Sequence, residues 1–127
     1  PTSQPAPDPT IVSRVMDGDT FELTTGHKIR VHGINSCESD TPGGVRAKND
    51  AQQLLPINGE VTLEWEGNTD KDRYGRHLRY VLLPDGRDFA QVMVVKNHTE
   101  AYKGGDASKD YQDKMLVLDT PPRVCEE

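Results

Sequence analysis

The residues of this sequence that could do chemistry stand at the ends of alternating apolar segments. "DGDT" occupies positions 17–20, "IRVHGINSCE" occupies positions 29–38 and "DRYGR" occupies positions 72–76. Each stretch is ordinary on its own, because aspartate and glycine are common turn residues and short motifs often match by chance. Together they place two arginines, a glutamate and an aspartate at strand ends: Arg30, Arg76, Glu38 and Asp19.

These four side chains are the set that chemistry on a phosphodiester requires. The planar guanidinium of arginine donates paired hydrogen bonds to phosphate oxygens and stays charged at any relevant pH. A hard cation beside Asp19 would neutralise charge and orient water, and Glu38 could position or deprotonate that water. The pattern therefore predicts a site at which Arg30 and Arg76 hold a phosphate.

The segments around the motifs predict an α+β fold. Residues 10–23 divide into two strands at the "DGD" turn, and a third strand follows at 27–34. Strands, then a helix, then more strands and helices in so short a chain favour a five-stranded antiparallel β-barrel of the OB type with about three packed α-helices. The later elements are expected as strands at 60–66 and from 76, and as helices at 43–56, 87–97 and 106–119.

Length and charge set limits on the organisation of the chain. The 127 residues suffice for one domain, and no apolar run approaches the roughly 20 residues of a membrane span. We expect a linker-like arm at 1–9, the folded domain at 10–120 and an extended acidic tail at 121–127, in a monomer. The net charge of −6 argues against a uniformly basic nucleic-acid-binding surface. Half of that negative charge lies in residues 100–127, which leaves room for a locally basic cleft in the body.

The order of "VMDGDTFEL", "IRVHGI" with "CE", and "DRYGRHLRYV", followed by an "LPDG" turn and an apolar helix, resembles the staphylococcal nuclease-like (thermonuclease) family. The resemblance covers residues 11 to about 103. It implies an OB-fold barrel with three helices and Ca²⁺-dependent cleavage of DNA and RNA that leaves 3′-phosphates. It also implies that Arg30 and Arg76 stabilise the phosphate and that Glu38 is the general base.

The resemblance further suggests a calcium site and substrate contacts. Asp19, Asn35 and the backbone carbonyl of Ser36 take the positions of the Ca²⁺ ligands, and Asp17 is either a turn former or a carboxylate near the metal. Tyr102 and Lys103 fall where the family has a base-stacking, phosphate-contacting edge. From their charge alone, three more residues are either substrate contacts or ordinary solvated surface residues: Lys71, Arg73 and Arg79.

Two positions depart from the pattern of the family. Asn35 stands where the family has an aspartate, so the site loses one formal negative charge and we expect weaker metal binding. Cys37 replaces the proline before the glutamate, which removes a constraint on the segment that carries Glu38. Cys37 and Cys125 are either two free thiols or one disulfide, which would be worth on the order of 4 kcal/mol and would imply a secreted or cell-surface protein.

A disulfide would also tie the tail "PPRVCEE" beside the site. Glu126 and Glu127 would there repel an incoming phosphate backbone or contribute to a metal site. Two hypotheses follow from the sequence. The first is a metal-dependent nuclease acting on DNA or RNA, and the second is a catalytically weak or inactive barrel that binds nucleic acid or a protein partner.

Overall fold

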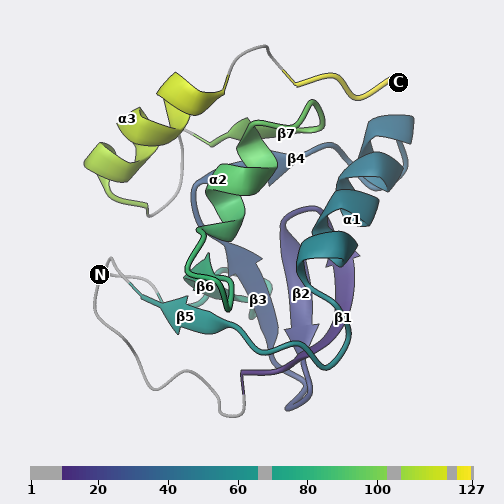
Figure 1. Cartoon of the computed structure of the whole chain (residues 1–127), viewed down its shortest axis with the longest axis vertical. Helices are drawn as coiled ribbons and strands as arrows, with labels where there is room; N and C mark the ends of the chain where they lie inside the picture. Colours follow the sequence, from purple (N-terminus) through teal and green to yellow (C-terminus); the bar gives the residue numbers. More distant parts are fainter. Residues whose placement is uncertain (1–9, 66–69, 103–106, 120–122, 127) are drawn as a thin grey trace.

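The computed structural model describes residues 10–65, 70–102, 107–119 and 123–126. The predicted arm at 1–9 lies outside these residues. The described parts form a mixed α+β fold in which the helices lie on one side of a twisted sheet (Figure 1). The elements in chain order are β1 (Val12–Asp17), β2 (Thr20–Leu23), β3 (Lys28–Val31), β4 (Ile34–Ser36), α1 (Pro42–Leu54), β5 (Thr62–Glu64), β6 (His77–Leu82), α2 (Phe89–Val94), β7 (Thr99–Ala101) and α3 (Lys109–Leu118).

The main sheet has five strands in the order β1-β2-β3-β6-β5. The first three strands form the expected antiparallel meander, but β3 pairs with β6 in parallel, so the expectation of a wholly antiparallel sheet is wrong. The long connection through β4, α1 and β5 returns the chain in the same direction, which parallel pairing requires. This pairing brings the start of β6, and the loop before it, beside β3.

The described strands do not close into a barrel. Between the outer strands β1 and β5 there is one isolated bridge, Ile11 to Glu60, outside both elements. Backbone hydrogen bonds from Val12 N to Gly59 O (2.8 Å) and from Val61 N to Thr10 O (3.1 Å) accompany it. The α+β class is therefore confirmed, whereas the sheet itself is open.

Strands β4 and β7 form a separate antiparallel pair that the sequence did not predict. Each has only three residues, too few for an alternating pattern to stand out. Asn35 pairs with Glu100 and Ser36 pairs with Thr99. This pair holds the segment after β3 in an extended conformation, and so it fixes where Asn35 and Ser36 lie.

The three predicted helices are present and shorter than expected, most of all α2, which has 6 residues where 87–97 was predicted. Each helix follows an N-cap residue whose side chain accepts a hydrogen bond from a backbone N–H group of the first turn. This bond satisfies a donor that has no partner within the helix. The caps are Thr41 for α1, Asp88 for α2 and Ser108 for α3. Pro42 is at the first position of α1, where its missing N–H costs nothing.

The hydrophobic core lies between the sheet and the helices. Phe21, Ile29 and Val81 of the sheet are at most 1% exposed, as are Phe89 and Met93 of α2. These residues belong to one core cluster, in which α2 packs against β6, so the polar residues at the strand ends project from a rigid support. No helix in the described parts of the chain is long and apolar enough to cross a bilayer.

Candidate active site

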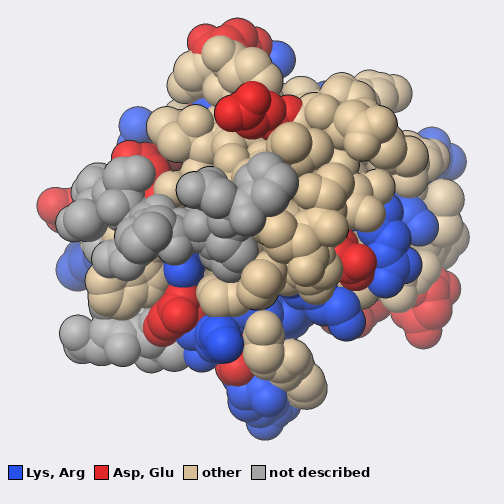
Figure 2. All heavy atoms as spheres, turned by 90° about the horizontal axis from the view of Figure 1, so that it is seen from below, with Lys and Arg blue, Asp and Glu red and all other residues tan. Residues whose placement is uncertain are grey.

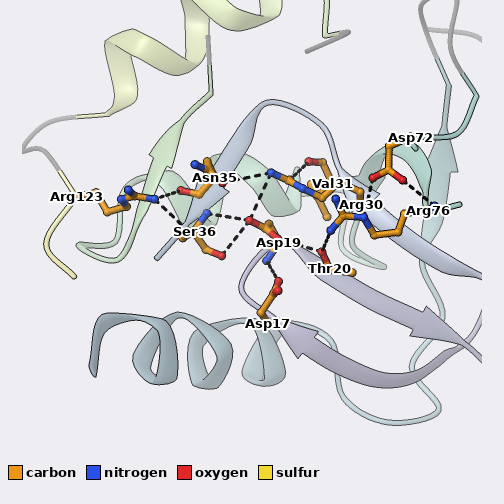
Figure 3. A network of polar contacts seen from close by, with 10 residues as sticks. All are labelled: Asp17, Asp19, Thr20, Arg30, Val31, Asn35, Ser36, Asp72, Arg76 and Arg123. Carbon is orange, nitrogen blue, oxygen red and sulfur yellow. Dashed lines mark hydrogen bonds and ion pairs between the residues drawn. The ribbon is translucent and has the colours of Figure 1, made fainter. Parts of the chain in front are cut away.

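The centre of the candidate site is the turn between β1 and β2. Asp19 is only 7% exposed, and it accepts hydrogen bonds from Thr20 and Ser36. Its Oδ2 accepts from the backbone N and the Oγ of Ser36, both at 3.0 Å, and its Oδ1 accepts from Thr20 Oγ at 3.0 Å. Figure 3 shows Asp19 between β4 and the start of β2. The predicted ligands Asp19 and Ser36 are thus in direct contact.

Arg30 projects from β3 into the same centre. Its Nη2 lies 3.5 Å from Asp19 Oδ2 and 3.4 Å from Asn35 Oδ1, and its Nη1 donates to Val31 O at 2.7 Å. The side chain of Arg30 is 13% exposed. Both contacts of Nη2 are longer than a typical hydrogen bond. This nitrogen is therefore held in position but makes no short hydrogen bond.

Arg76 approaches from the other side, in the loop before β6. Its Nε donates to Asp72 Oδ2 at 2.6 Å, and its Nη1 reaches Thr20 Oγ at 3.4 Å. Asp72 Oδ1 also accepts the backbone N–H groups of Tyr74 and Arg76, which folds "DRYGR" into a compact turn. Thr20 thereby connects Arg76 to Asp19, so the two predicted arginines meet at adjacent residues of one turn (Figure 3).

Glu38 is exposed, in the loop after β4. Among the described residues its carboxylate makes no hydrogen bond or ion pair, and the contacts around Asp19 and Arg30 do not include it. Its backbone is nevertheless fixed, because its carbonyl oxygen accepts from the N and Oγ of Thr41 at 3.0 and 2.7 Å. Gly44 packs directly on that carbonyl, and a Cβ at this position would overlap it.

The two aspartates of the turn have opposite pKa shifts. Burial acts to raise the pKa of Asp19, but the charge of Arg30 and the hydrogen bonds from Ser36 and Thr20 outweigh it and keep the pKa below its ordinary value. Burial and the neighbouring Asp19 carboxylate raise the pKa of Asp17 to about 6. Asp17 therefore ionises less readily than Asp19, although the two carboxylates share one turn.

The oxygen atoms around Asp19 are of the kinds that bind a hard cation. Carboxylate, amide and backbone carbonyl oxygens are the usual ligands of Ca²⁺, and the pKa of Asp17 is raised by its burial and by the Asp19 carboxylate beside it. No group of three or more His, Cys, Asp or Glu side chains suited to a metal occurs in the described ranges. A cation here would thus rely on Asn35 and on the carbonyl of Ser36 beside the carboxylates.

Cys37 and Cys125 form a disulfide, which the sequence had left open. It brings the C-terminal segment to the end of β4. There Arg123 Nη1 donates to the carbonyl oxygens of Asn35 (3.3 Å) and Ser36 (3.1 Å), and Arg123 Nε lies 3.7 Å from Glu100 Oε1. The polar contacts in Figure 3 therefore run from Arg123 through Ser36 and Asp19 to Arg76.

The predicted substrate contacts divide into three groups. Lys71, Arg73 and Tyr102 are exposed, and Arg73 stacks on the Tyr74 ring with its guanidinium carbon 4.9 Å from the ring centroid. Arg79 is instead buried at 3% exposure and paired with Asp70 at 2.7 Å, so it is not placed to contact substrate. Lys103 lies outside the described residues, as does Glu127.

Basic side chains gather on part of the surface despite the negative net charge. In the view of Figure 2, from the lower end of Figure 1, Lys and Arg side chains follow one edge of the molecule and alternate with a few acidic ones. An edge of this kind attracts a phosphate backbone locally.

Sequence reasoning missed three residues of the site: Thr20, Asp72 and Arg123. Thr20 and Asp72 lie inside the motifs that we singled out, and their roles follow from the side chains beside them. Arg123 gave one signal, its position two residues before a cysteine. Only the pairing of that cysteine with Cys37 shows that Arg123 reaches the site.

No family model matches this chain. The chain is 37% identical over 86 residues to a protein named "Uncharacterized endonuclease" from Escherichia coli O157:H7, and equally to a protein of the same name from Escherichia coli. The aligned region makes up 65% of this chain and 54% of each relative. The chain thus spans about half the length of the curated relatives that it matches.

Proposed function

We propose that this chain carries a nuclease site that hydrolyses phosphodiester bonds of DNA, RNA or both, of the staphylococcal nuclease-like type. The observation that carries the proposal is the convergence of Arg30 and Arg76 on adjacent residues. Arg30 lies 3.5 Å from Asp19, and Arg76 lies 3.4 Å from Thr20, although 46 positions separate the two arginines in the sequence. The endonuclease names of the two relatives support the same class of activity.

In this proposal the two guanidinium groups bind one phosphate from two sides. Their side chains are 13% and 27% exposed, so each is partly shielded from water yet accessible to a ligand. Hydrogen bonds from preorganised donors are stronger at such a site than in bulk water, and they stabilise the additional negative charge of the transition state. Asp19 and Asp72 orient the two arginines before substrate arrives.

Glu38 is proposed as the group that accepts a proton from the attacking water. Its exposed carboxylate is unengaged among the described residues, which suits a general base that needs a substrate-bound water as its partner. The contact of Gly44 with the Glu38 carbonyl oxygen and the bonds from Thr41 fix the backbone of this segment. They take over the constraint that a proline at position 37 would supply.

Ca²⁺ is the proposed cofactor, held by Asp19, Asn35 and the carbonyl of Ser36, with Asp17 beside them. When bound, a hard divalent ion neutralises phosphate charge and lowers the pKa of a coordinated water. The 3′-phosphate products and the OB-type class also belong to the proposal, because both come from the family resemblance.

The test is cleavage of labelled single-stranded DNA and RNA with Ca²⁺, with Mg²⁺ and with chelator. We expect Ca²⁺-dependent products that end in 3′-phosphate, and a loss of about 100-fold or more in Glu38→Gln. Asp40→Asn is the matched control, because Asp40 is an exposed carboxylate two residues further on in the same loop. A folded protein that cleaves neither substrate with either metal would contradict the nuclease proposal.

A module that binds nucleic acid or a protein without cleaving is the second candidate. Asn35 in place of a carboxylate favours it, as does the hydrogen bond of Arg123 to the Ser36 carbonyl oxygen that would bind the cation. In that case the protein would retard labelled single-stranded DNA in a native gel, and the cleavage assay would show no product. Substituting Asn35→Asp would then be the first attempt to restore cleavage.

We also propose that the protein acts outside the cytosol, as a secreted or cell-surface protein. The Cys37–Cys125 disulfide supports this location, because such bonds persist in oxidising compartments. Free thiols at both cysteines in protein taken from its native source under rapid alkylation would contradict it.

A further inference from the structure

The C-terminal segment places a positive charge on one of the oxygens proposed to bind the cation, the backbone carbonyl of Ser36. Arg123 Nη1 lies 3.1 Å from Ser36 O and 3.3 Å from Asn35 O, and the side chain is 24% exposed. Ser36 is in turn the residue whose N and Oγ donate to Asp19. A single residue therefore connects Arg123 to the central carboxylate.

This segment is held at four points around Arg123. Val124 N donates to Asn97 O at 2.7 Å, and Val124 O lies 2.8 Å from His98 Nδ1. Gly43 N donates to Cys125 O at 2.7 Å, and the missing side chain of Gly43 is what allows this approach, since a Cβ would lie 2.6 Å from Cys125 Cα. The fourth point is the disulfide from Cys125 to Cys37, the residue next to Ser36.

A guanidinium and a divalent cation at the same carbonyl oxygen repel each other. Like charges a few ångströms apart in a partly shielded site interact strongly, and the competing group here is part of the chain. A short covalent tether raises the local concentration of such a group into the millimolar range or above. A cation that binds Ser36 O must therefore either displace Arg123 or overcome its repulsion.

We propose that Arg123 is an internal competitor of the cation at the Asp19–Ser36 centre, and that the Cys37–Cys125 disulfide strengthens the competition by tethering Arg123 there. The inference rests on the proposed cation site, and it concerns affinity for the ion rather than the chemical step. It provides a second reason to expect weak metal binding, beside the negative charge that Asn35 lacks.

The experiment is a calorimetric titration of Ca²⁺ into the wild-type chain, Arg123→Gln and Arg87→Gln. Arg87→Gln is the matched control, because it removes the same charge from an exposed arginine that is paired with Asp85. With the disulfide intact we expect Arg123→Gln to bind Ca²⁺ about tenfold more tightly than the other two, a change of about 1.4 kcal/mol. Equal affinities of Arg123→Gln and Arg87→Gln, or weaker binding by Arg123→Gln, would overturn the proposal.

Reduction tests the tether separately. Dithiothreitol supplies the two electrons and two protons that convert the disulfide to two thiols, and is itself oxidised to its cyclic disulfide. We expect reduction to tighten Ca²⁺ binding several-fold in wild type and to change Arg123→Gln by less than twofold, with circular dichroism confirming that both remain folded. Equal changes in the two proteins would overturn the role of the tether.

The two proposals fail in different ways. If wild type and Arg123→Gln bind Ca²⁺ with equal affinity, the role of Arg123 is overturned and the cation site remains. Absence of Ca²⁺ binding by every form, Arg123→Gln included, overturns the cation site and with it the competition. Cleavage that persists in chelator would then retain the nuclease proposal without the ion.

Discussion

Two loops of this protein contain the same pair of hydrogen bonds between an aspartate and an arginine and differ in what lies beside them. In the loop before β6, Asp72 Oδ1 accepts the backbone N–H of Arg76, and Asp72 Oδ2 accepts Arg76 Nε at 2.6 Å. In the loop before α2, Asp85 Oδ1 accepts the backbone N–H of Arg87, and Asp85 Oδ2 accepts Arg87 Nε at 2.7 Å. The hydrogen bonds within each pair have nearly the same lengths.

The two arginines differ in their surroundings. The Arg76 side chain is 27% exposed and reaches Thr20, the neighbour of Asp19, whereas the Arg87 side chain is 56% exposed and among the described residues is paired only with Asp85. The parallel pairing of β3 with β6 is what brings the first loop to the Asp19 centre. A local motif therefore becomes part of a site through its position in the fold, not through its own hydrogen bonds.

The largest expected effect is on cleavage. Replacing Arg76 by glutamine removes a preorganised donor to the phosphate, so we expect the single-turnover rate on labelled single-stranded DNA to fall by about 100-fold. Arg87→Gln removes an arginine of the same local geometry and should stay within twofold of wild type. Equal losses in the two variants would mean that the loops do not differ in function.

A second expected difference concerns stability. Asp19→Ala leaves Arg30 and the N–H of Ser36 without their buried acceptor, so we expect the free energy of unfolding to fall by about 2 to 4 kcal/mol. Asp85→Ala breaks a pair in solvent and should leave the urea midpoint nearly unchanged. Both are measured by urea denaturation in chelator, so that a bound ion does not contribute. A small effect at Asp19 would mean that the centre is not preorganised.

A smaller effect follows from the raised pKa of Asp17, about 6 against an ordinary 3.8. The folded state holds a proton at Asp17 more tightly than the unfolded chain, so ionisation lowers stability as pH rises from 3.8 through 6. Asp17→Asn removes this cost. Allowing for partial solvent screening, we expect a gain of about 1 to 2 kcal/mol at about pH 8 that shrinks towards pH 4. The same gain at both pH values would contradict the assigned cause.

The sequence was sufficient where its signals were local. The turn at 17–20 and the three helices follow from turn residues, helical spacing and proline boundaries, and the structure brings the predicted Asp19, Arg30 and Arg76 close together. The aspartates that pair with Arg30 and Arg76 both lie within the motifs quoted above. That Asp19 pairs with Arg30, and Asp72 with Arg76, became known only from the structure. The short pair of β4 and β7 was missed because three residues on each side give no period to detect.

The sequence was insufficient where distant segments meet. The parallel pairing of β3 with β6 depends on a crossover of 45 intervening positions, and the position of Arg123 depends on a disulfide that spans 88. Arg79 was offered as a substrate contact from its charge alone. Its burial against Asp70 is a tertiary fact that charge does not reveal.

The most direct test of the account is a double-mutant cycle between Arg30 and Arg76, measured as single-turnover cleavage of single-stranded DNA. If both arginines bind one phosphate, their effects are coupled, and the double variant Arg30→Gln/Arg76→Gln should lose at least about tenfold less than the product of the two single losses. The parallel cycle of Arg30 with Arg87 should be multiplicative. Multiplicative losses for Arg30 and Arg76, or no loss in either single variant, would contradict the claim that these two side chains form one site.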